Sequence, residues 1–268
     1  MERYKLLYME NKKSTEWICL DKTRNYISHA PKASKYILEL LSGNVTDSER
    51  PDFLIKNKVG VIGVEHFLID TMIGRKKSAR SRLRTSEVRR IFDKYHGVIE
   101  GNEENALNEI ETIVQSDVDA IQNFDYQKFI SEFERIVKEH AKNVREYKKL
   151  HENIVKLAFL IEIPISKNKM VGTSISGERD IITDNRFPIT VGMLEVLKEI
   201  SDKVDYVIIS IVREDCTKLP YAVYAIDGSK FEESIAAQLK EIYQSFTYSW
   251  QEMPVKAKIK LNLKQNDN

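Results

Sequence analysis

Residues 51–70 read Pro-Asp-Phe-Leu-Ile-Lys-Asn-Lys-Val-Gly-Val-Ile-Gly-Val-Glu-His-Phe-Leu-Ile-Asp, two apolar runs that flank a short polar segment. This pattern predicts a β-hairpin with Asp52 and Glu65 in or beside its strands. A carboxylate is costly to bury in a strand unless a cation lies beside it. The hairpin is therefore a candidate metal-binding site.

The length of the hairpin loop decides whether the two carboxylates meet. A two-residue loop places Asp52 across from Gly63, on the same face of the hairpin as Glu65. A four-residue loop places Asp52 directly opposite Glu65, and a three-residue loop places the two on opposite faces. Either even-length loop lets one divalent cation bridge both carboxylates. In a regular strand, His66 points to the face opposite Glu65.

The rest of the chain predicts a mixture of helices and strands. Apolar residues recur at threes and fours over residues 120–154, which predicts one long amphipathic helix. A continuous apolar run at 155–165 is typical of a strand covered on both faces. We therefore predict an α+β (mixed α/β) fold, with a central mixed β-sheet flanked by helices. Residues 1–165 form its α/β core, and 166–268 form a C-terminal α/β extension or part of the same domain.

Shorter elements are assigned from local patterns of apolar, polar and turn-forming residues. Strands are expected at residues 3–9, 16–20, 204–212, 221–226 and 255–263. Helices are expected at residues 31–41, 191–201 and 231–246, and polar loops at residues 42–50 and 166–187.

The composition argues against several kinds of site. The 268 residues include 42 basic and 41 acidic side chains, so the net charge of +1 argues neither for nor against a polyanionic partner, and only local clustering of charge bears on it. The two cysteines, Cys19 and Cys216, lie far apart, which argues against a disulfide framework or a Cys-based zinc site. The histidines outside the hairpin lack metal-ligand spacing and receive no role; they are His29, His96, His140 and His151.

The chain shows no sequence signal for a membrane. No apolar run reaches the about 20 residues needed to span a bilayer. The N-terminus reads Met-Glu-Arg-Tyr-Lys-Leu-Leu-Tyr and lacks a continuous hydrophobic signal core. We therefore expect a cytoplasmic protein that does not bind a membrane.

Charge is arranged in blocks after the hairpin. Residues 75–90 carry eight basic side chains and one acid, whereas residues 100–119 carry seven acids and no Lys or Arg. The basic block is either a solvated face paired with the acidic block or a surface for the phosphate backbone. Its candidate nucleic-acid-binding residues are Arg75, Lys76, Lys77, Arg80, Arg82 and Arg84.

The hairpin resembles the PD-(D/E)xK nuclease superfamily, whose members share a helix-flanked mixed sheet. In that superfamily a Pro-Asp begins one strand and an acid-x-Lys lies on the next, as Pro51, Asp52 and Glu65 do here. The resemblance implies that Asp52 and Glu65 bind Mg²⁺, which activates water and stabilises charge on the scissile phosphate. An acid on the preceding helix often assists, and Glu39 is the candidate. We also consider Glu162 as a third acid.

The sequence departs from the superfamily pattern at two points. Phe67 stands where the motif has a lysine that helps to position or deprotonate the attacking water. We expect Lys76 or Lys77 to reach back and take over that catalytic role. The strand that usually precedes the Pro-Asp strand is not evident between Gly43 and Arg50.

Two functions of different classes follow from these residues. The favoured one is a metal-dependent nuclease that hydrolyses phosphodiester bonds of nucleic acid, with Mg²⁺ as its cofactor. The alternative is a non-catalytic nucleic-acid-binding or protein-interaction protein on a degenerate nuclease-like fold, which the missing lysine supports. In that case the long helix offers a surface for a homodimer or another partner. A purely structural domain without affinity for polyanions is a third possibility.

Overall fold

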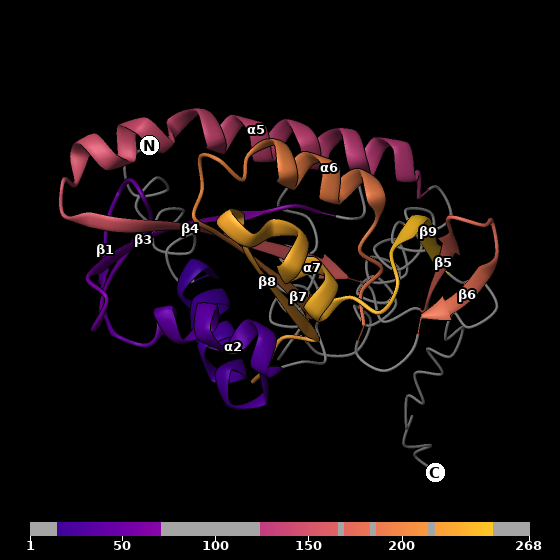
Figure 1. Ribbon diagram of the computed structural model, residues 1–268, viewed down its shortest axis with the longest axis horizontal. Helices are drawn as coiled ribbons and strands as arrows, with labels where there is room; N and C mark the ends of the chain where they lie inside the picture. The colour runs from indigo at the N-terminus through magenta and orange to yellow at the C-terminus, as the bar shows by residue number, and fades with distance from the viewer. Residues whose placement is uncertain (1–14, 71–123, 166–168, 183–185, 214–217, 249–268) are drawn as a thin grey trace, which may run out of the picture.

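The computed structural model describes residues 15–70, 124–165, 169–182, 186–213 and 218–248. In this part of the chain the strands form two sheets, shown with their helices in Figure 1. The larger sheet has six strands in the order β1-β2-β3-β4-β7-β8, and the smaller has three in the order β6-β5-β9. This is the α+β fold with a central mixed sheet that the sequence predicts.

The six-stranded sheet begins as an antiparallel hairpin and continues with parallel strands. β1, β2 and β3 are antiparallel neighbours, β3, β4 and β7 run parallel, and β8 is antiparallel to β7. The C-terminal strands β7 and β8 therefore extend the sheet that the hairpin starts. The strands are β1 (Asn44–Asp47), β2 (Phe53–Lys56), β3 (Val61–Leu68), β4 (Ile154–Ile165), β7 (Tyr206–Arg213) and β8 (Ala222–Asp227).

Helices cover both faces of the larger sheet. Figure 1 shows the long helix α5 along one face and α2 on the opposite side. Residues 15–25 are also helical and pack on the α2 side. The other helices are η1 (Tyr26–His29), α2 (Lys32–Leu38), η2 (Glu39–Leu41), α5 (Tyr126–Leu150), α6 (Val191–Glu199), η3 (Gly228–Lys230) and α7 (Phe231–Gln238).

The long helix α5 confirms the amphipathic helix predicted around residues 120–154. Asp125 caps its first turn by accepting hydrogen bonds from the backbone N–H groups of Gln127 (2.9 Å) and Lys128 (3.3 Å). Its apolar stripe packs against the sheet, whereas its outer face carries ion pairs such as Arg135 with Glu132. The buried residues are Phe129, Phe133, Val137, Ala141, Val144 and Tyr147. Among the helices described, none combines the length and apolar character of a membrane span.

Alternation along β3 directs neighbouring side chains into different layers. Ile62 and Val64 belong to the core formed with α2 and the 15–25 helix. Phe67 belongs to the core formed with α5. Because side chains of a strand alternate between faces, Glu65 lies on the α5 side and His66 on the side of the 15–25 helix.

The strand expected at residues 16–20 is wrong, because this segment is helical. Its buried residues are Glu16, Cys19, Leu20 and Thr23, at a spacing of three to four positions. That spacing places them on one face of a helix, turned toward the sheet. A short apolar run allows either structure, and tertiary packing decides between them.

The polar loop expected at residues 42–50 is also wrong, because it contains the edge strand β1. β1 pairs with β2 from Asn44 opposite Lys56 to Asp47 opposite Phe53. Its side chains are mostly exposed, so it lacks the apolar alternation that identifies a half-buried strand. β1 supplies the strand that was not evident between Gly43 and Arg50.

Two further predictions are partly wrong, because strands lie where a loop and the end of a helix are expected. The loop expected at residues 166–187 contains β5 (Met170–Ser174) and β6 (Arg179–Ile182). The helix expected at residues 231–246 ends at Gln238 in α7, and β9 (Tyr243–Tyr248) follows it. β5 pairs with β6, which follows it directly in the chain, and with β9, which is distant in sequence. The strands expected at residues 3–9 and 255–263 lie outside the described residues.

Candidate functional site

The hairpin register brings the two predicted metal ligands face to face. Phe53 pairs with Val64 and Lys56 with Val61, so four residues connect the strands. Continuing this register by one residue places Asp52 opposite Glu65. This is the four-residue alternative, and it puts both residues on the side of the sheet that α5 covers.

Asp52 lies in a crowded, negatively charged environment at the start of β2. Its Oδ2 accepts a hydrogen bond of 2.7 Å from the backbone N–H of His66. The pKa of the Asp52 carboxyl is raised to about 7, mainly by burial and to a smaller extent by the negative charges of Glu65 and Glu16. Asp52 is therefore a largely desolvated carboxyl in the field of two other acids.

Glu65 has one oxygen held by the protein and one that is not. The Tyr147 hydroxyl donates to Glu65 Oε1 at 2.9 Å, and His140 Nδ1 lies 2.8 Å from the same oxygen. Glu65 Oε2 is buried and has no hydrogen-bond partner among the described residues. Leaving a buried acceptor unpaired costs about 1–3 kcal/mol, and more for a charged group. A cation bound at Oε2 would remove that cost.

His140 connects this buried pair to the surface. Its ring stacks on Phe67, with centroids 4.2 Å apart and planes inclined by 10°. Its side chain is 27% exposed, whereas that of Glu65 is 9% exposed. Phe67 stands where the superfamily motif has lysine, so the imidazole of His140 lies beside that position. Within the described part of the chain, His140 Nε2 has no hydrogen-bond partner.

The helical acid whose charge acts on Asp52 is Glu16, and not Glu39 as expected. Glu16 is buried in the 15–25 helix, and its charge contributes to the raised pKa of Asp52. Glu39 is exposed in η2, whose Leu40 carbonyl accepts a 2.8 Å hydrogen bond from the side chain of Asn57 in the hairpin loop. The five residue steps from Asp52 to Asn57 span about 16 Å of strand. Glu39 therefore lies near the loop end of the hairpin, away from Asp52.

Glu162 lies on the opposite side of the sheet from Glu65. Its Oε2 is 2.9 Å from His66 Nε2, and both side chains are 4% exposed. Cys19 lies beside them, and the three ligand atoms are within 4.8 Å of one another. Of the four predicted metal ligands, the structure therefore brings together Asp52 and Glu65 and places Glu39 and Glu162 elsewhere.

Part of the predicted site lies outside the described residues. Lys76 and Lys77, expected to replace the motif lysine, belong to residues 71–123. The other expected nucleic-acid contacts in the same segment are Arg75, Arg80, Arg82 and Arg84. Both roles remain predictions.

Three residues of the site escaped the sequence analysis: Glu16, His140 and Tyr147. Glu16 escaped because its segment was assigned as a strand. Glu65 meets His140 and Tyr147 across 75 and 82 residues of sequence, respectively, so no local spacing reveals the contacts. One signal was present: a histidine on the apolar stripe of a helix is a polar group turned toward the core, which needs a partner.

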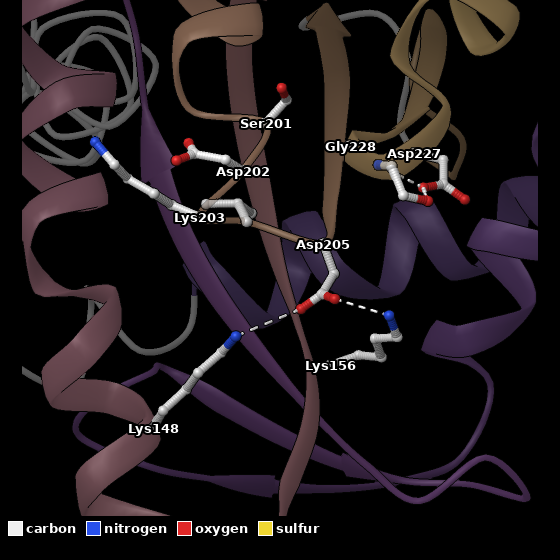
Figure 2. A pocket seen from close by; sticks show the side chains of 10 residues that line it. Lys148, Lys156, Ser201, Asp202, Lys203, Asp205, Asp227 and Gly228 are labelled. Atoms are coloured by element: carbon white, nitrogen blue, oxygen red, sulfur yellow. Dashed lines mark hydrogen bonds and ion pairs between the residues drawn. The ribbon is translucent and has the colours of Figure 1, made fainter.

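A polar pocket of about 410 Å³ lies apart from this site, at the amino ends of β4 and β7 (Figure 2). Open α/β sheets usually bind ligands at the carboxyl ends of their strands. The charged residues that line the pocket are Lys148, Lys156 and Lys203 with Asp202, Asp205 and Asp227. Equal numbers of lysines and aspartates leave the pocket without a strong preference for an anion.

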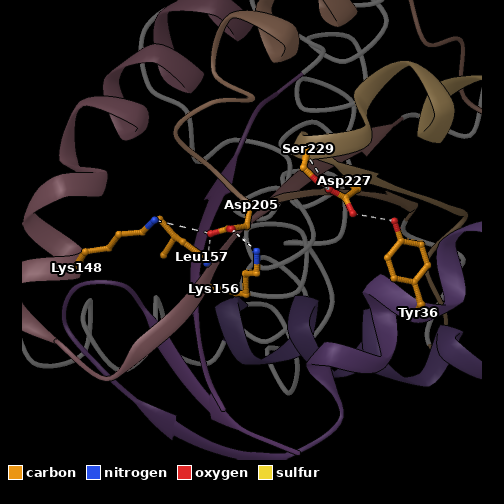
Figure 3. Close-up of polar contacts among 7 residues, drawn as sticks. All are labelled: Tyr36, Lys148, Lys156, Leu157, Asp205, Asp227 and Ser229. Atoms are coloured by element: carbon orange, nitrogen blue, oxygen red, sulfur yellow. Dashed lines mark hydrogen bonds and ion pairs between the residues drawn. The ribbon is translucent and has the colours of Figure 1, made fainter. Parts of the chain in front are cut away.

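Internal contacts hold the two central aspartates of this pocket (Figure 3). Asp205 contacts Lys156 Nζ at 2.8 Å and Lys148 Nζ at 3.8 Å, and it accepts a 3.0 Å hydrogen bond from the Leu157 N–H. Asp227 accepts a 3.0 Å hydrogen bond from the Tyr36 hydroxyl. These contacts join α5, α2 and the sheet, which indicates a structural junction.

Comparisons of the chain with protein-family models, curated proteins and solved structures found no match. The functional argument therefore rests on the geometry around Asp52 and Glu65.

Proposed function

We propose that this chain is a metal-dependent nuclease in which Asp52 and Glu65 hold Mg²⁺. The observation that carries the proposal is Glu65 Oε2, a buried carboxylate oxygen without a protein partner, in a residue directly opposite a second acid. Neighbouring buried carboxylates repel each other unless a proton or a cation lies between them. Carboxylate oxygens are the ligands that Mg²⁺ prefers.

The order of the elements supports the same proposal. Helical segments within residues 15–41 precede β1, and β1 precedes the Pro-Asp strand β2, which is the helix–strand–strand order that the resemblance to the nuclease superfamily implies. Glu16 on the 15–25 helix provides the assisting acid in place of Glu39. β1 and Glu16 thus support the proposal, β1 by its place before β2 and Glu16 by its effect on Asp52.

Within the proposed site, His140 takes the role of the motif lysine. Bound Mg²⁺ would supply the positive charge that stabilises the phosphate during hydrolysis. With Nδ1 donating to Glu65 Oε1, the Nε2 of a neutral His140 keeps a lone pair that can accept the proton of the attacking water. Glu65 thus divides its two oxygens, with Oε1 orienting His140 and Oε2 directed to the cation.

Amide variants of the acidic pair test this proposal. Plasmid DNA, single-stranded DNA and RNA are incubated with the full chain and Mg²⁺, and the initial rate of cleavage is measured. Asp52→Asn and Glu65→Gln keep the side-chain size and remove the charge. We expect each to lower the rate at least about 100-fold, because even residues behind metal ligands contribute 10- to 100-fold. Glu39→Gln, an exposed acid at the other end of the hairpin, is the matched control.

Metal binding provides a second readout that does not depend on cleavage. Titration calorimetry with Mn²⁺ should show weaker binding in Asp52→Asn and Glu65→Gln than in the wild type. Glu39→Gln should bind as the wild type does. Equal cleavage and equal Mn²⁺ affinity in all four proteins would overturn the assignment of Asp52 and Glu65.

The alternative function is a non-catalytic nucleic-acid-binding protein on the same fold. Phe67 favours it, since the motif lysine is replaced by a buried apolar ring. In that case binding to nucleic acid persists in EDTA and no preparation cleaves it. Affinity should then fall steeply with salt, because counterion release drives contact with the phosphate backbone. A domain with a purely structural role would show no such binding.

The homodimer expected through the long helix stays a prediction. The apolar stripe of α5 packs against the sheet, so a dimer would use the charged outer face. That face carries the ion pairs of Arg135 with Glu132 and Glu139 and of Lys138 with Glu134. Such a dimer would therefore dissociate more readily at high salt.

A further inference from the structure

Three side chains of metal-ligand type lie together on the face of the sheet opposite Glu65. Cys19 comes from the 15–25 helix, His66 from β3 and Glu162 from β4. The three residues are 1%, 8% and 3% exposed, respectively. One ligand atom from each lies within 4.8 Å of the other two.

The fold positions this cluster from three distant parts of the chain. β3 and β4 pair in parallel with Leu68 opposite Glu162, so His66 and Glu162 are diagonal neighbours on one face. His66 Nε2 and Glu162 Oε2 are 2.9 Å apart. Cys19 lies on the buried stripe of the 15–25 helix, which faces these strands.

We propose that Cys19, His66 and Glu162 bind a zinc ion. Thiolate, imidazole and carboxylate are all zinc ligands, whereas Mg²⁺ takes oxygen ligands and does not favour a thiolate. When zinc binds, the Cys19 thiol loses its proton to water and a sulfur–zinc bond forms. The proton between His66 Nε2 and Glu162 Oε2 leaves to water or to His66 Nδ1, because both atoms become ligands. A water molecule takes the fourth position, as in other sites with three protein ligands.

Charge balance favours zinc in this buried position. One thiolate and one carboxylate neutralise the 2+ charge of the ion, and a neutral imidazole adds none. The loaded site therefore has no net charge, in a place where burial strongly penalises charge. The ligand atoms of a tetrahedral zinc site lie about 3.3–3.8 Å apart, so the 2.9 Å contact opens slightly on loading.

The proposed ion would fix the helix that carries Glu16. It joins that helix to β3 and β4, behind the Asp52–Glu65 pair. In addition, the backbone N–H of His66 donates to Asp52 Oδ2, so a fixed His66 also fixes the position of Asp52. The zinc site is thus a positioning element, and its existence does not depend on nuclease activity.

Competitive titration tests the site directly. The full chain is titrated with Zn²⁺ against a chromophoric chelator, and we expect one tightly bound ion per chain. Cys19→Ser and Glu162→Gln should each weaken the affinity at least about tenfold. The control Cys216→Ser changes the other cysteine of the chain and should keep the wild-type affinity. The double variant Asp52→Asn/Glu65→Gln should keep it as well, which separates this site from the proposed magnesium site.

Cobalt spectroscopy of the wild type tests for the Cys19 ligand without a variant, so the test does not depend on whether a variant folds. Co²⁺ bound by Cys19 should produce a thiolate-to-cobalt charge-transfer band in the near ultraviolet. Zinc should also raise the Tm of the wild type, because a ligand that binds only the folded state stabilises it. Failure of the wild type to bind zinc, a cobalt complex without the thiolate band, or loss of zinc binding in the Asp52/Glu65 double variant would each overturn the proposal.

Discussion

Glu65 and His66 are consecutive residues of β3, and each lies in a buried polar cluster on its own side of the sheet. On the α5 side, Glu65 keeps one oxygen without a partner, and its neighbour His140 is 27% exposed. On the other side, His66 and Glu162 contact each other at 2.9 Å, and both side chains are 4% exposed. One cluster is therefore open to solvent through His140, and the other is closed.

The difference separates a site suited to reaction from a site suited to structure. A hydrolytic site needs access for water and substrate, and a proton acceptor within reach of both. Only the Glu65 cluster of these two combines a partly exposed imidazole with a carboxylate oxygen that has no partner among the described residues. The closed cluster offers no such access, so an ion bound there would join the 15–25 helix to β3 and β4 and would not meet a substrate.

The largest expected effect concerns His140, because it decides whether the open cluster is reactive. If its Nε2 accepts the proton of the attacking water, His140→Ala should lower the cleavage rate by a factor on the order of 10²–10⁴. Mn²⁺ affinity should change much less. The matched control is His29→Ala, an exposed histidine beside Ser28. Wild-type cleavage by His140→Ala would show that the base lies elsewhere.

A smaller effect contrasts the two buried glutamates by the same chemical change. In metal-free protein, Glu162→Gln should lower the free energy of unfolding by about 1.5–3 kcal/mol, the value of a hydrogen bond to a charged group. Glu65→Gln should change it less, since loss of that charge relieves repulsion with Asp52. Urea unfolding measures both. Equal losses in the two variants would contradict the distinction between open and closed clusters.

The pH dependence of stability tests the charge on the open side. The pKa of Asp52 is raised from 3.8 to about 7, so the folded chain binds this proton more tightly than the unfolded chain. Protonated Asp52 therefore makes its full contribution to the free energy of unfolding below about pH 4. This contribution is lost as the pH rises to about 7, by at most about 1.4 kcal/mol per pH unit. Asp52→Asn should remove this component from urea unfolding curves recorded without divalent cations. An unchanged profile would argue that Asp52 titrates normally.

The smallest effect concerns Tyr147, which holds Glu65 Oε1 from α5. Its hydroxyl donates at 2.9 Å, and His140 remains beside the same oxygen when the hydroxyl is removed. Tyr147→Phe should therefore lower the free energy of unfolding by only about 0.5–1.5 kcal/mol. Tyr126→Phe, whose hydroxyl donates to Thr190 at 2.8 Å on the same helix, is a useful comparison. A loss of several kcal/mol in Tyr147→Phe alone would mean that Glu65 depends on this single contact.

The most regular patterns in the sequence predicted the fold correctly. The apolar stripe of α5 and the continuous apolar run of β4 each follow one period over many residues, so local sequence identifies them. The edge strand β1 and the helix at 15–25 lack such length. Each depends on a neighbour for its identity: β1 on pairing with β2, and the helix on packing against the sheet.

The candidate site also has a part that the sequence predicts and a part that depends on tertiary structure. The sequence placed Asp52 and Glu65 on one hairpin but left three loop lengths open, and the backbone pairing of Lys56 with Val61 selected four residues. The sequence favours Glu39, the acid of the helix expected at residues 31–41. In the structure it is the charge of Glu16 that acts on Asp52. The sequence does not reveal this, because the orientation of a helix over a sheet depends on packing contacts from the whole domain.

The sequence by itself determined that Asp52 and Glu65 belong to one hairpin and that Glu65 and His66 point apart, because a strand alternates its side chains with a period of two. Only the tertiary structure decided which side chains contact Glu65 and which contact His66. His140 and Tyr147 approach Glu65 from a helix 75 and 82 residues away, and Cys19 and Glu162 approach His66 from a helix and a neighbouring strand. Such encounters depend on the direction of chain crossovers and on helix packing, which local residue patterns do not specify.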